Sequence, residues 1–527
     1  MEQQNVLKRQ HGLFVSICFV VGFLVGTGIF FLPGRVLYAV YGSVTHGVLA
    51  WVIGGLMIAP CVYMFAIFAG KFEKIHGFVD YSEAIVGRKY GYLAGWFFAV
   101  MYQPAGFAII SWITSGFIAT LGGMTGADPV YMPFRFFISA FNMAMVFMIN
   151  YFIPKIPVKL NVATTVARMI PLVLMGTVGV FVAWVLRSQS MFDSVLFWGA
   201  TVSDNVFLYG ETAEDFRRLL IPERDINMFA AISATAFAFN GWQAALAFNS
   251  EVKDSKRKFP FALMFGFGII IVIYVLYFIG VTTASADATW VLRYGSGANF
   301  ARGTHMAFNS IFGETLGGLL IVFMIISGLG ILNACCLGMS RAMFSLGKRD
   351  MGPMPERMKI LDPITNVPNN SMVIAVGIGF AWLVVIFANQ FWFHNFTFSL
   401  PDFYNYSFFG MLIPIFICFM LRQTDVHPAK RFFFPILAII GAGFMFATYW
   451  IGSPRHAAIY TATFTGLALL GYVCHVWRRI ILAIKNKFLN HIPTDISYDE
   501  IISHEANNDE TFHDETHLDE THLDEAP

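Results

Sequence analysis

Charged residues are scarce in this chain, because Asp, Glu, Lys and Arg together make up only 13% of its 527 residues. Soluble domains contain about 25%. Hydrophobic residues reach 57% here, and phenylalanine alone occurs 57 times. The composition excludes an ordinary soluble domain and predicts an all-α polytopic membrane protein.

Cysteine is also scarce, and its spacing excludes a paired metal-ligand motif. The six cysteines fall within or at the end of apolar stretches and are expected to be small packing residues: Cys18, Cys61, Cys335, Cys336, Cys418 and Cys474. We therefore expect no bound metal ion and no cofactor. We also expect no nucleic-acid partner.

Apolar stretches of about 20 residues, long enough to cross a bilayer as helices, occur along most of the chain. They predict about twelve spans, near 13–34, 42–69, 92–121, 133–153, 160–186, 227–250, 260–282, 315–341, 371–389, 402–421, 432–451 and 456–477. Lys and Arg concentrate in alternate connections, such as 253–258 and 341–359. The positive-inside rule then places both termini in the cytoplasm, with the protein in the cell membrane.

Two segments fall outside the predicted bundle. Residues 187–226 form a long acidic connection that is expected to be external. The end of the chain contains the repeat HDETHLDETHLDE, which is typical of a disordered acidic tail. Its His and acidic residues have no fold to fix a metal geometry, so we assign this tail no chemistry.

The first span, Val20–Pro33 (VVGFLVGTGIFFLP), is interrupted by Gly26, Thr27 and Gly28. A helix that stops and restarts leaves amide and carbonyl groups without partners in a medium without water. A ligand could satisfy these groups. Alternatively, the glycines only allow close helix packing.

A second interruption, Asn240 and Gly241 in the sequence FAFNGW, falls in the middle of the sixth span. Breaks at corresponding positions of two halves indicate a transporter with inverted repeats. A half-helix N-terminus attracts a carboxylate, and free carbonyls attract an ammonium group. An α-amino acid carries both groups.

The motifs resemble those of the amino acid–polyamine–organocation (APC) superfamily, most nearly the L-type and bacterial amino acid exchangers. GTGIF resembles the first-helix GSGIF, and FAFNGW followed by SEVKDSKRKFP resembles FAYxGW and EEVKNPxRxxP. YQPAGFAII and LGILNACCLGMSRAMFSLGKRDMGPMP resemble third- and eighth-helix motifs. The second helix, APCVYMFAIFAG, lacks the Glu of the YAEL motif that many relatives carry.

The resemblance implies a LeuT-type fold with two inverted five-helix repeats and two further C-terminal helices. The implied parts are a cytoplasmic N-terminus, a first repeat, the external acidic loop, a second repeat, helices 11 and 12, and the cytoplasmic tail. Their boundaries are 1–12, 13–186, 187–226, 227–421, 422–479 and 480–527.

The resemblance also implies a binding scheme. Thr27 and Gly28 would offer amides to the substrate carboxylate, and carbonyls of both breaks would take the ammonium group. Phe237 would act as a gate over the substrate, while Phe239 and Trp242 either shape the side-chain pocket or simply pack. The implied substrate-binding set is Leu24, Val25, Gly26, Thr27, Gly28, Phe237, Ala238, Phe239, Asn240 and Trp242.

Arg168 stands in the fifth span, where many sodium-independent relatives have Lys. A buried cation there is a functional candidate. It could replace the sodium ion that coupled relatives bind nearby, or brace the first and eighth helices through backbone carbonyls. Proton coupling would need a titratable group within a span, and His46 is the clearest candidate.

These observations predict sodium-independent exchange of α-amino acids. Neutral substrates are expected, because no acidic side chain flanks either break. Amino acid–amine exchange and proton-coupled symport remain alternatives, and Asn240 and Gln243 could bond a polar substrate side chain. A membrane enzyme would need an interfacial His, Asp, Glu or Ser cluster, and a sensor would need a signalling module. Because no cysteine lies in an external loop, we expect no disulfide-linked heavy chain.

Overall fold

The structure is a computed structural model. It describes residues 12–40, 43–72, 77–126, 128–153, 156–182, 226–246, 252, 255–283, 300–362, 367–392 and 398–489. The expected acidic loop, apart from its last residue, and the tail beyond Leu489 lie outside these residues. Every secondary-structure element longer than one residue in the described part of the chain is a helix, which confirms the all-α prediction.

The first half of the chain contains α1 to α8 and two π-helical turns. Their bounds are α1 (Leu13–Leu24), α2 (Gly28–Ala39), α3 (Val44–Lys71), α4 (Phe78–Val86), α5 (Arg88–Trp96), η1 (Phe97–Tyr102), α6 (Gln103–Leu121), α7 (Tyr131–Phe152), α8 (Ile156–Leu174) and η2 (Met175–Gly179).

The second half begins at α13 and ends at α22. Its elements are α13 (Met228–Thr235), α14 (Trp242–Leu246), α15 (Ser255–Thr283), α17 (Phe300–Lys348), α18 (Pro355–Met358), α19 (Asn369–Phe391), α20 (Leu400–Arg422), η5 (Ala429–Phe433), α21 (Phe434–Gly452) and α22 (Pro454–Leu489). The long helix α17 bends at Gly313, where φ is 77°. Helix α22 continues past residue 479, where the tail was expected to begin.

Ten of the described helical segments are long and apolar enough to cross a membrane. The two other expected spans are the first and the sixth. They are split into α1 and α2, and into α13 and α14, at the glycine-containing positions that the sequence singles out. The split in each case replaces a continuous span by two short helices.

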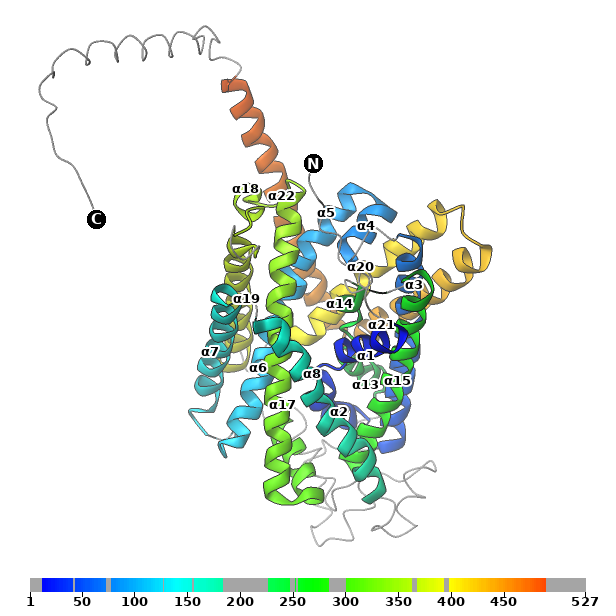
Figure 1. Ribbon diagram of the computed structural model, residues 1–527, viewed down its shortest axis with the longest axis vertical. Coiled ribbons are helices and arrows are strands. Elements are labelled where there is room, and N and C mark those ends of the chain that lie inside the picture. Colours follow the sequence, from blue (N-terminus) through cyan, green and yellow to red (C-terminus); the bar gives the residue numbers. More distant parts are fainter. Residues whose placement is uncertain are drawn as a thin grey trace, which may run out of the picture. The chain divides into compact units, whose positions relative to one another are not determined.

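The two halves pair with each other element by element. Helix α2 packs on α13, α1 packs on α14, α3 packs along α15, and α6 packs along α17. First, second and third spans of one half therefore contact their counterparts in the other, as two pseudo-symmetric repeats would. Figure 1 shows the short helices of the two broken spans lying together among the long helices.

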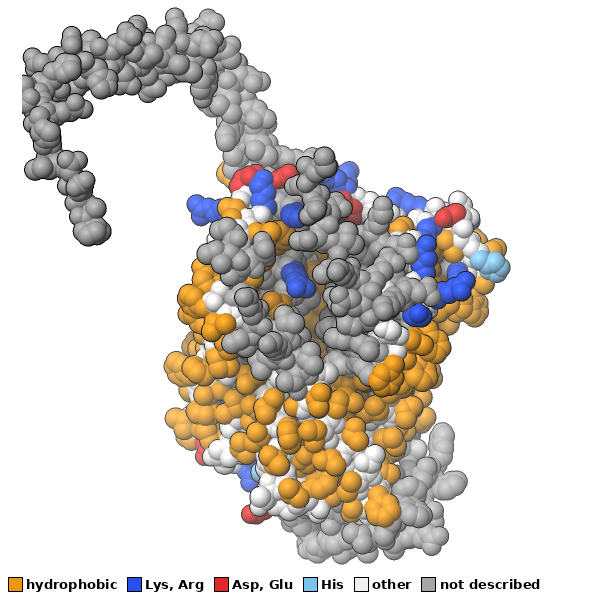
Figure 2. Space-filling view, in the orientation of Figure 1, with side chains coloured by type: hydrophobic (Ala, Val, Ile, Leu, Met, Phe, Trp, Pro, Cys, Tyr) orange, Lys and Arg blue, Asp and Glu red, His pale blue; other side chains and the backbone are white. Residues whose placement is uncertain are grey.

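The surface fits a bilayer. Large hydrophobic side chains are exposed along several helices, among them Phe137, Phe141 and Val166. Figure 2 shows a broad hydrophobic band, with Lys and Arg side chains gathered above it, at the end where Figure 1 labels α4, α5 and α18. A contiguous apolar belt of this kind marks a surface that lies in lipid.

Ion pairs fix the connections near α4. Arg349, just after α17, pairs with Asp80 and Glu83 of α4. Lys71, at the end of α3, donates to Asp425, and this hydrogen bond lowers the pKa of the Asp425 carboxyl.

The chain divides into two compact units, the first ending at Gly471 and the second beginning at Tyr472. The residues discussed below all belong to the first unit.

Candidate functional site

The break in the first span is held open at its α1 end by Arg168. Val25 leaves the helix in an extended conformation, with φ −70° and ψ 96°. Arg168 Nη1 donates to the carbonyl oxygens of Gly22 at 2.9 Å and Val25 at 3.0 Å. Its Nε donates to Thr164 O in the same helix, and the side chain is buried. The guanidinium thus satisfies carbonyls that the end of α1 leaves without helical partners.

Tyr274 of α15 links the two breaks. Its hydroxyl lies 3.0 Å from Leu24 O of the first break and 3.2 Å from Ala238 O of the second. A phenol has one proton to donate, so the two carbonyls share a single donor. Rotation of the hydroxyl hydrogen about the C–O bond can therefore direct the hydrogen bond to either break.

The α2 side of the first break carries polar groups that lack partners among the described residues. The Thr27 hydroxyl is buried without a hydrogen-bond partner, and the Thr27 and Gly28 amides donate to no described residue. Such amides at a helix N-terminus attract anions. A buried hydroxyl beside them adds one more polar group that a carboxylate could satisfy.

Gly28 lets the two breaks approach each other. A Cβ atom at position 28 would lie 2.8 Å from Ala238 Cα and 3.0 Å from Phe237 Cδ1. Backbone cannot move aside as a flexible side chain can, so any larger residue must separate the breaks. The close approach is a contact between the predicted carboxylate and ammonium sites.

The second break is shaped by its own side chains. Gly241 has φ 115°, a conformation that side chains rarely adopt, and its amide donates to Gln243 Oε1 at 2.9 Å. Asn240 Nδ2 donates to Asn405 Oδ1 of α20, while Gln243 Nε2 donates to Asn240 Oδ1 at 3.5 Å. Asn240 and Gln243 are therefore already bonded within the protein.

The backbone carbonyls of the two breaks are unequally occupied. Those of Leu24 and Ala238 accept from Tyr274, and that of Val25 accepts from Arg168. The carbonyls of Phe237 and Asn240 accept no hydrogen bond from any residue that the structure describes. Among the described residues, these two oxygens are therefore candidates to bind a cation.

Phe237 lies between two other aromatic rings. Its ring centroid is 5.7 Å from that of Phe31 in α2 and 5.5 Å from that of Tyr404 in α20. Tyr404 in turn stacks on Tyr102, at the end of η1, with centroids 4.0 Å apart. Phe237 thus contacts α2 and α20 directly, and it is linked to η1 through Tyr404.

Phe239 and Trp242 are fully buried in other aromatic groups. Phe239 packs against Tyr274 at 5.4 Å and Trp51 at 5.8 Å between centroids. Trp242 packs against Phe65 at 4.9 Å. Of the two roles that the sequence left open, packing is the one these contacts support.

His46 lies in the first turn of α3. Its Nδ1 is 2.8 Å from the hydroxyl of Ser43, the residue that caps this helix. A role for His46 in proton coupling stays a prediction.

Arg168 bonds carbonyl groups of α1, as the bracing alternative requires. Within the described residues, its hydrogen bonds do not reach α17.

Sequence reasoning did not single out Tyr274, Tyr404 and Asn405. Each is a polar residue inside an otherwise apolar span, and that exception was the available signal. Many other residues in the spans are also polar. Only the orientation of α15 and α20 about their helix axes shows which of these residues face the breaks.

Comparison with known proteins identifies relatives along nearly the whole bundle. The chain matches the amino acid permease family over residues 12–473. It is 26% identical over 451 residues to the serine/threonine exchanger SteT of Bacillus subtilis (strain 168), covering 84% of this chain and 91% of that protein.

Two mammalian transporters are also similar. Identity is 22% to the b(0,+)-type amino acid transporter 1 of Mus musculus, covering 89% of this chain and 88% of that protein. It is 23% to the Asc-type amino acid transporter 1 of Homo sapiens, covering 86% and 79%. Together with the paired breaks, the match over residues 12–473 confirms the resemblance: the chain belongs to the amino acid permease family.

Proposed function

We propose that this protein is a sodium-independent transporter of neutral α-amino acids that works by exchange across the cell membrane. The observation that carries the proposal is the contact between the two breaks at Gly28 and Ala238. It brings unpaired amides and unpaired carbonyls to one place in the bundle. Alternating access would expose this place to each side of the membrane in turn.

The substrate carboxylate would bind the Thr27 and Gly28 amides, with the Thr27 hydroxyl as a further donor. The ammonium group would bind the carbonyls of Phe237 and Asn240, because those of Leu24, Val25 and Ala238 already accept hydrogen bonds. Phe237 would cover the bound substrate and move when the site opens.

Arg168 supports sodium independence. Its guanidinium donates to Gly22 O and Val25 O, the type of oxygen ligand that a hard cation such as sodium would otherwise use. Arginine also keeps its charge at physiological pH. A fixed cation at the break would repel a second cation.

Neutral substrates are supported by the charges around the breaks. None of the described side chains that bond to either break is a carboxylate: they are those of Arg168, Tyr274, Gln243 and Asn405. A second ammonium on the substrate would therefore have no counter-charge there. The name of one relative, a serine/threonine exchanger, supports both exchange and a small substrate.

The test is efflux of radiolabelled serine from proteoliposomes at fixed pH without sodium. We expect slow efflux into buffer and fast efflux when unlabelled serine is outside. Vesicles with the Gly28→Leu variant are the matched control. Efflux that proceeds unaided, or only with a proton gradient, would reject exchange and direct attention to His46.

A further inference from the structure

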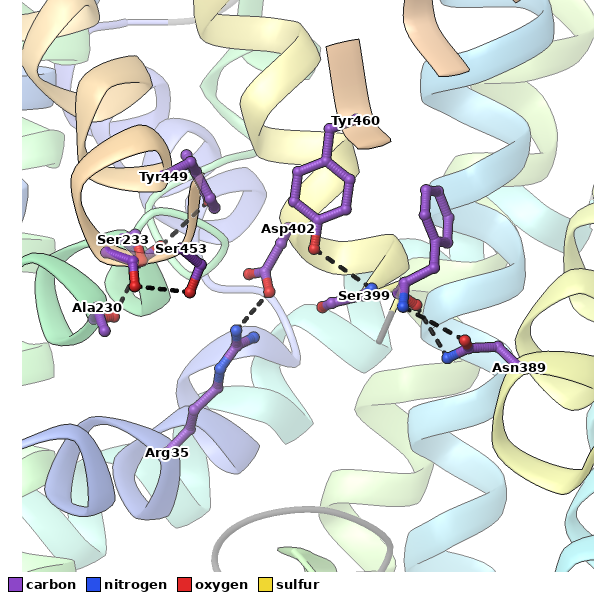
Figure 3. A network of polar contacts seen from close by, with 11 residues as sticks. Arg35, Ala230, Ser233, Asn389, Ser399, Asp402, Tyr449, Ser453 and Tyr460 are labelled. Atoms are coloured by element: carbon purple, nitrogen blue, oxygen red, sulfur yellow. Dashed lines mark hydrogen bonds and ion pairs between the residues drawn. The ribbon is translucent and has the colours of Figure 1, made fainter. Parts of the chain in front are cut away.

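Helix α20 carries a charged residue near each end, and the two charges are neutralised differently. Near its start, the Asp402 carboxylate pairs with the Arg35 guanidinium, and Figure 3 shows the carboxylate directed at that group. At its last residue, Arg422 Nη1 donates to the backbone oxygens of Ile85 and Val86 at the end of α4. The charge at this end therefore has backbone partners but no carboxylate among the described residues.

Further basic residues surround this end of α20. Arg431 of η5 donates from Nε to Met420 O at 2.9 Å and from Nη2 to Leu421 O at 3.5 Å. A Cβ atom on Gly87 would lie 3.8 Å from Arg422 Nη1, so α5 begins beside this guanidinium. We call the five basic residues at this end of α20 the basic cluster: Arg88, Lys89, Arg422, Lys430 and Arg431.

The carboxylates of the neighbouring elements are already paired with other cations. Asp80 and Glu83 of α4 pair with Arg349, and Asp425, which follows α20, pairs with Lys71. None of the basic-cluster residues forms an ion pair in the part of the chain that the structure describes. The C-terminal carbonyls of α4 and α20 carry only partial negative charges, so the basic cluster keeps a net positive charge.

Backbone hydrogen bonds hold two arginines of the basic cluster in place. Arg422 and Arg431 each use part of their five N–H groups on carbonyls at helix ends, and their other N–H groups bond to no described residue. A guanidinium held in this way can bind two oxygens of a phosphate while losing little further side-chain freedom. The chemistry of the basic cluster therefore suits a phosphate group.

Exposed apolar side chains lie next to the basic cluster. Leu421, the residue before Arg422, is 65% exposed, and Phe433 at the end of η5 is 62% exposed. Ile436 and Ile440 of α21 are also exposed and follow Phe433 at the spacing of one helix face. Figure 2 shows Lys and Arg side chains gathered at the edge of the hydrophobic band. A phosphate bound here would therefore have an apolar surface beside it.

We propose that the basic cluster binds the phosphate headgroup of an acidic phospholipid, whose acyl chains lie along the exposed apolar face of α21. A soluble phosphate gains only the charged contacts, whereas a phospholipid gains the charged and the apolar contacts together. A zwitterionic lipid brings an ammonium group, which the positive charges repel. The bound lipid joins the α4–α5 turn to η5 and α21. Its binding does not depend on the proposed transport function.

The test is native mass spectrometry of the purified full chain, titrated with phosphatidylglycerol or with phosphatidylcholine. We expect phosphatidylglycerol to bind about tenfold more tightly or better. The double variant Lys89→Gln with Lys430→Gln should weaken phosphatidylglycerol about 25-fold, since roughly 1 kcal/mol for each basic residue is a factor of about five. Phosphatidylcholine binding should not change. Neither lysine side chain bonds to a described residue, so this variant should keep the fold.

The double variant Lys348→Gln with Lys359→Gln is the matched control. It removes the same charge from the end of the bundle where α18 lies, but outside the basic cluster. Lys359 already pairs with Asp350 and Glu356, and Lys348 lies over the Phe344 ring at 5.1 Å. We expect this control to change phosphatidylglycerol binding less than about twofold, because exposed and paired charges contribute little.

Equal weakening by the two double variants would overturn the proposal, because it would reflect a general attraction of positive surface for acidic lipid. Displacement of phosphatidylglycerol by inorganic phosphate or by oligoglutamate at equal concentration would also overturn it, since the acyl chains would then contribute nothing. If the Lys89 and Lys430 double variant does not fold, Arg431→Lys serves in its place. It keeps the charge but loses the guanidinium fork, so phosphatidylglycerol should bind severalfold more weakly, and unchanged binding would reject the phosphate site.

Discussion

The two breaks differ in where the hydrogen-bond partners of their backbone groups come from. In the first, partners come from other helices, since Arg168 of α8 and Tyr274 of α15 bond the carbonyls at the end of α1. In the second, Tyr274 bonds Ala238 O and Asn405 of α20 bonds Asn240, but Gln243 also bonds the nearby Gly241 amide and the Asn240 side chain. The first break therefore depends on distant side chains, and the second carries more of its own support.

This difference implies unequal tolerance to mutation. Losing one distant side chain should disturb the first break more than the loss of one local contact disturbs the second. The contact at Gly28 is the exception, because it belongs to both breaks. The following changes test that ranking, beginning with the one that should do most.

Gly28→Leu should abolish amino acid binding and exchange while the protein stays folded. Its side chain would occupy the 2.8 Å approach to Ala238 Cα and separate the breaks. Binding of radiolabelled serine to purified protein measures the effect. Gly377→Leu is the control, since a Cβ there meets nothing within 4 Å. Binding retained in Gly28→Leu would remove the carboxylate site.

Arg168→Ala should reduce exchange strongly and lower the free energy of unfolding. It leaves the Gly22 and Val25 carbonyls without their donor, at about 1–3 kcal/mol for each buried group. Thermal unfolding and efflux measure the two effects, and Arg168→Lys should retain part of both.

Sodium separates the two roles of Arg168. If the guanidinium only braces α1, adding sodium to Arg168→Ala vesicles should change nothing. Recovery of transport with sodium would show that the charge replaces a bound cation, and the bracing account would then be insufficient.

Phe237→Ala should slow exchange about tenfold with a smaller effect on binding. It removes two ring contacts, each worth about 0.5–1.5 kcal/mol, from the side chain proposed to cover the substrate. Parallel efflux and binding assays detect the split. Phe239→Ala, in the same break but packed away from it, should instead lower thermal stability. An unchanged exchange rate in Phe237→Ala would exclude a gate there.

Tyr274→Phe should have the smallest effect, a severalfold loss of apparent affinity. The hydroxyl contributes about 1 kcal/mol as one hydrogen bond shared by two carbonyls. Tyr277→Phe, three residues along the same helix, is the matched control because its buried hydroxyl has no partner among the described residues. Equal effects of the two changes would mean that the link between the breaks is unimportant.

The positions of the breaks could be predicted from sequence because glycine and asparagine are poor helix formers wherever they occur. Arg168 could be singled out because a cation in a span needs a partner, although its contacts with Gly22 and Val25 could not be chosen over others. The Asn240–Asn405 bond and the shared Tyr274 hydroxyl depend on how α15 and α20 are rotated. Spacing within one span carries no information on that rotation.

The most direct test of the paired-break site is competition against bound radiolabelled serine by serine, its decarboxylated amine, and the α-hydroxy acid that lacks the ammonium group. The account predicts that only serine competes well, because the amides bind the carboxylate, the carbonyls bind the ammonium group, and each of the other two compounds lacks one of these groups. An amine that competes as strongly as serine would contradict the carboxylate site and support amino acid–amine exchange.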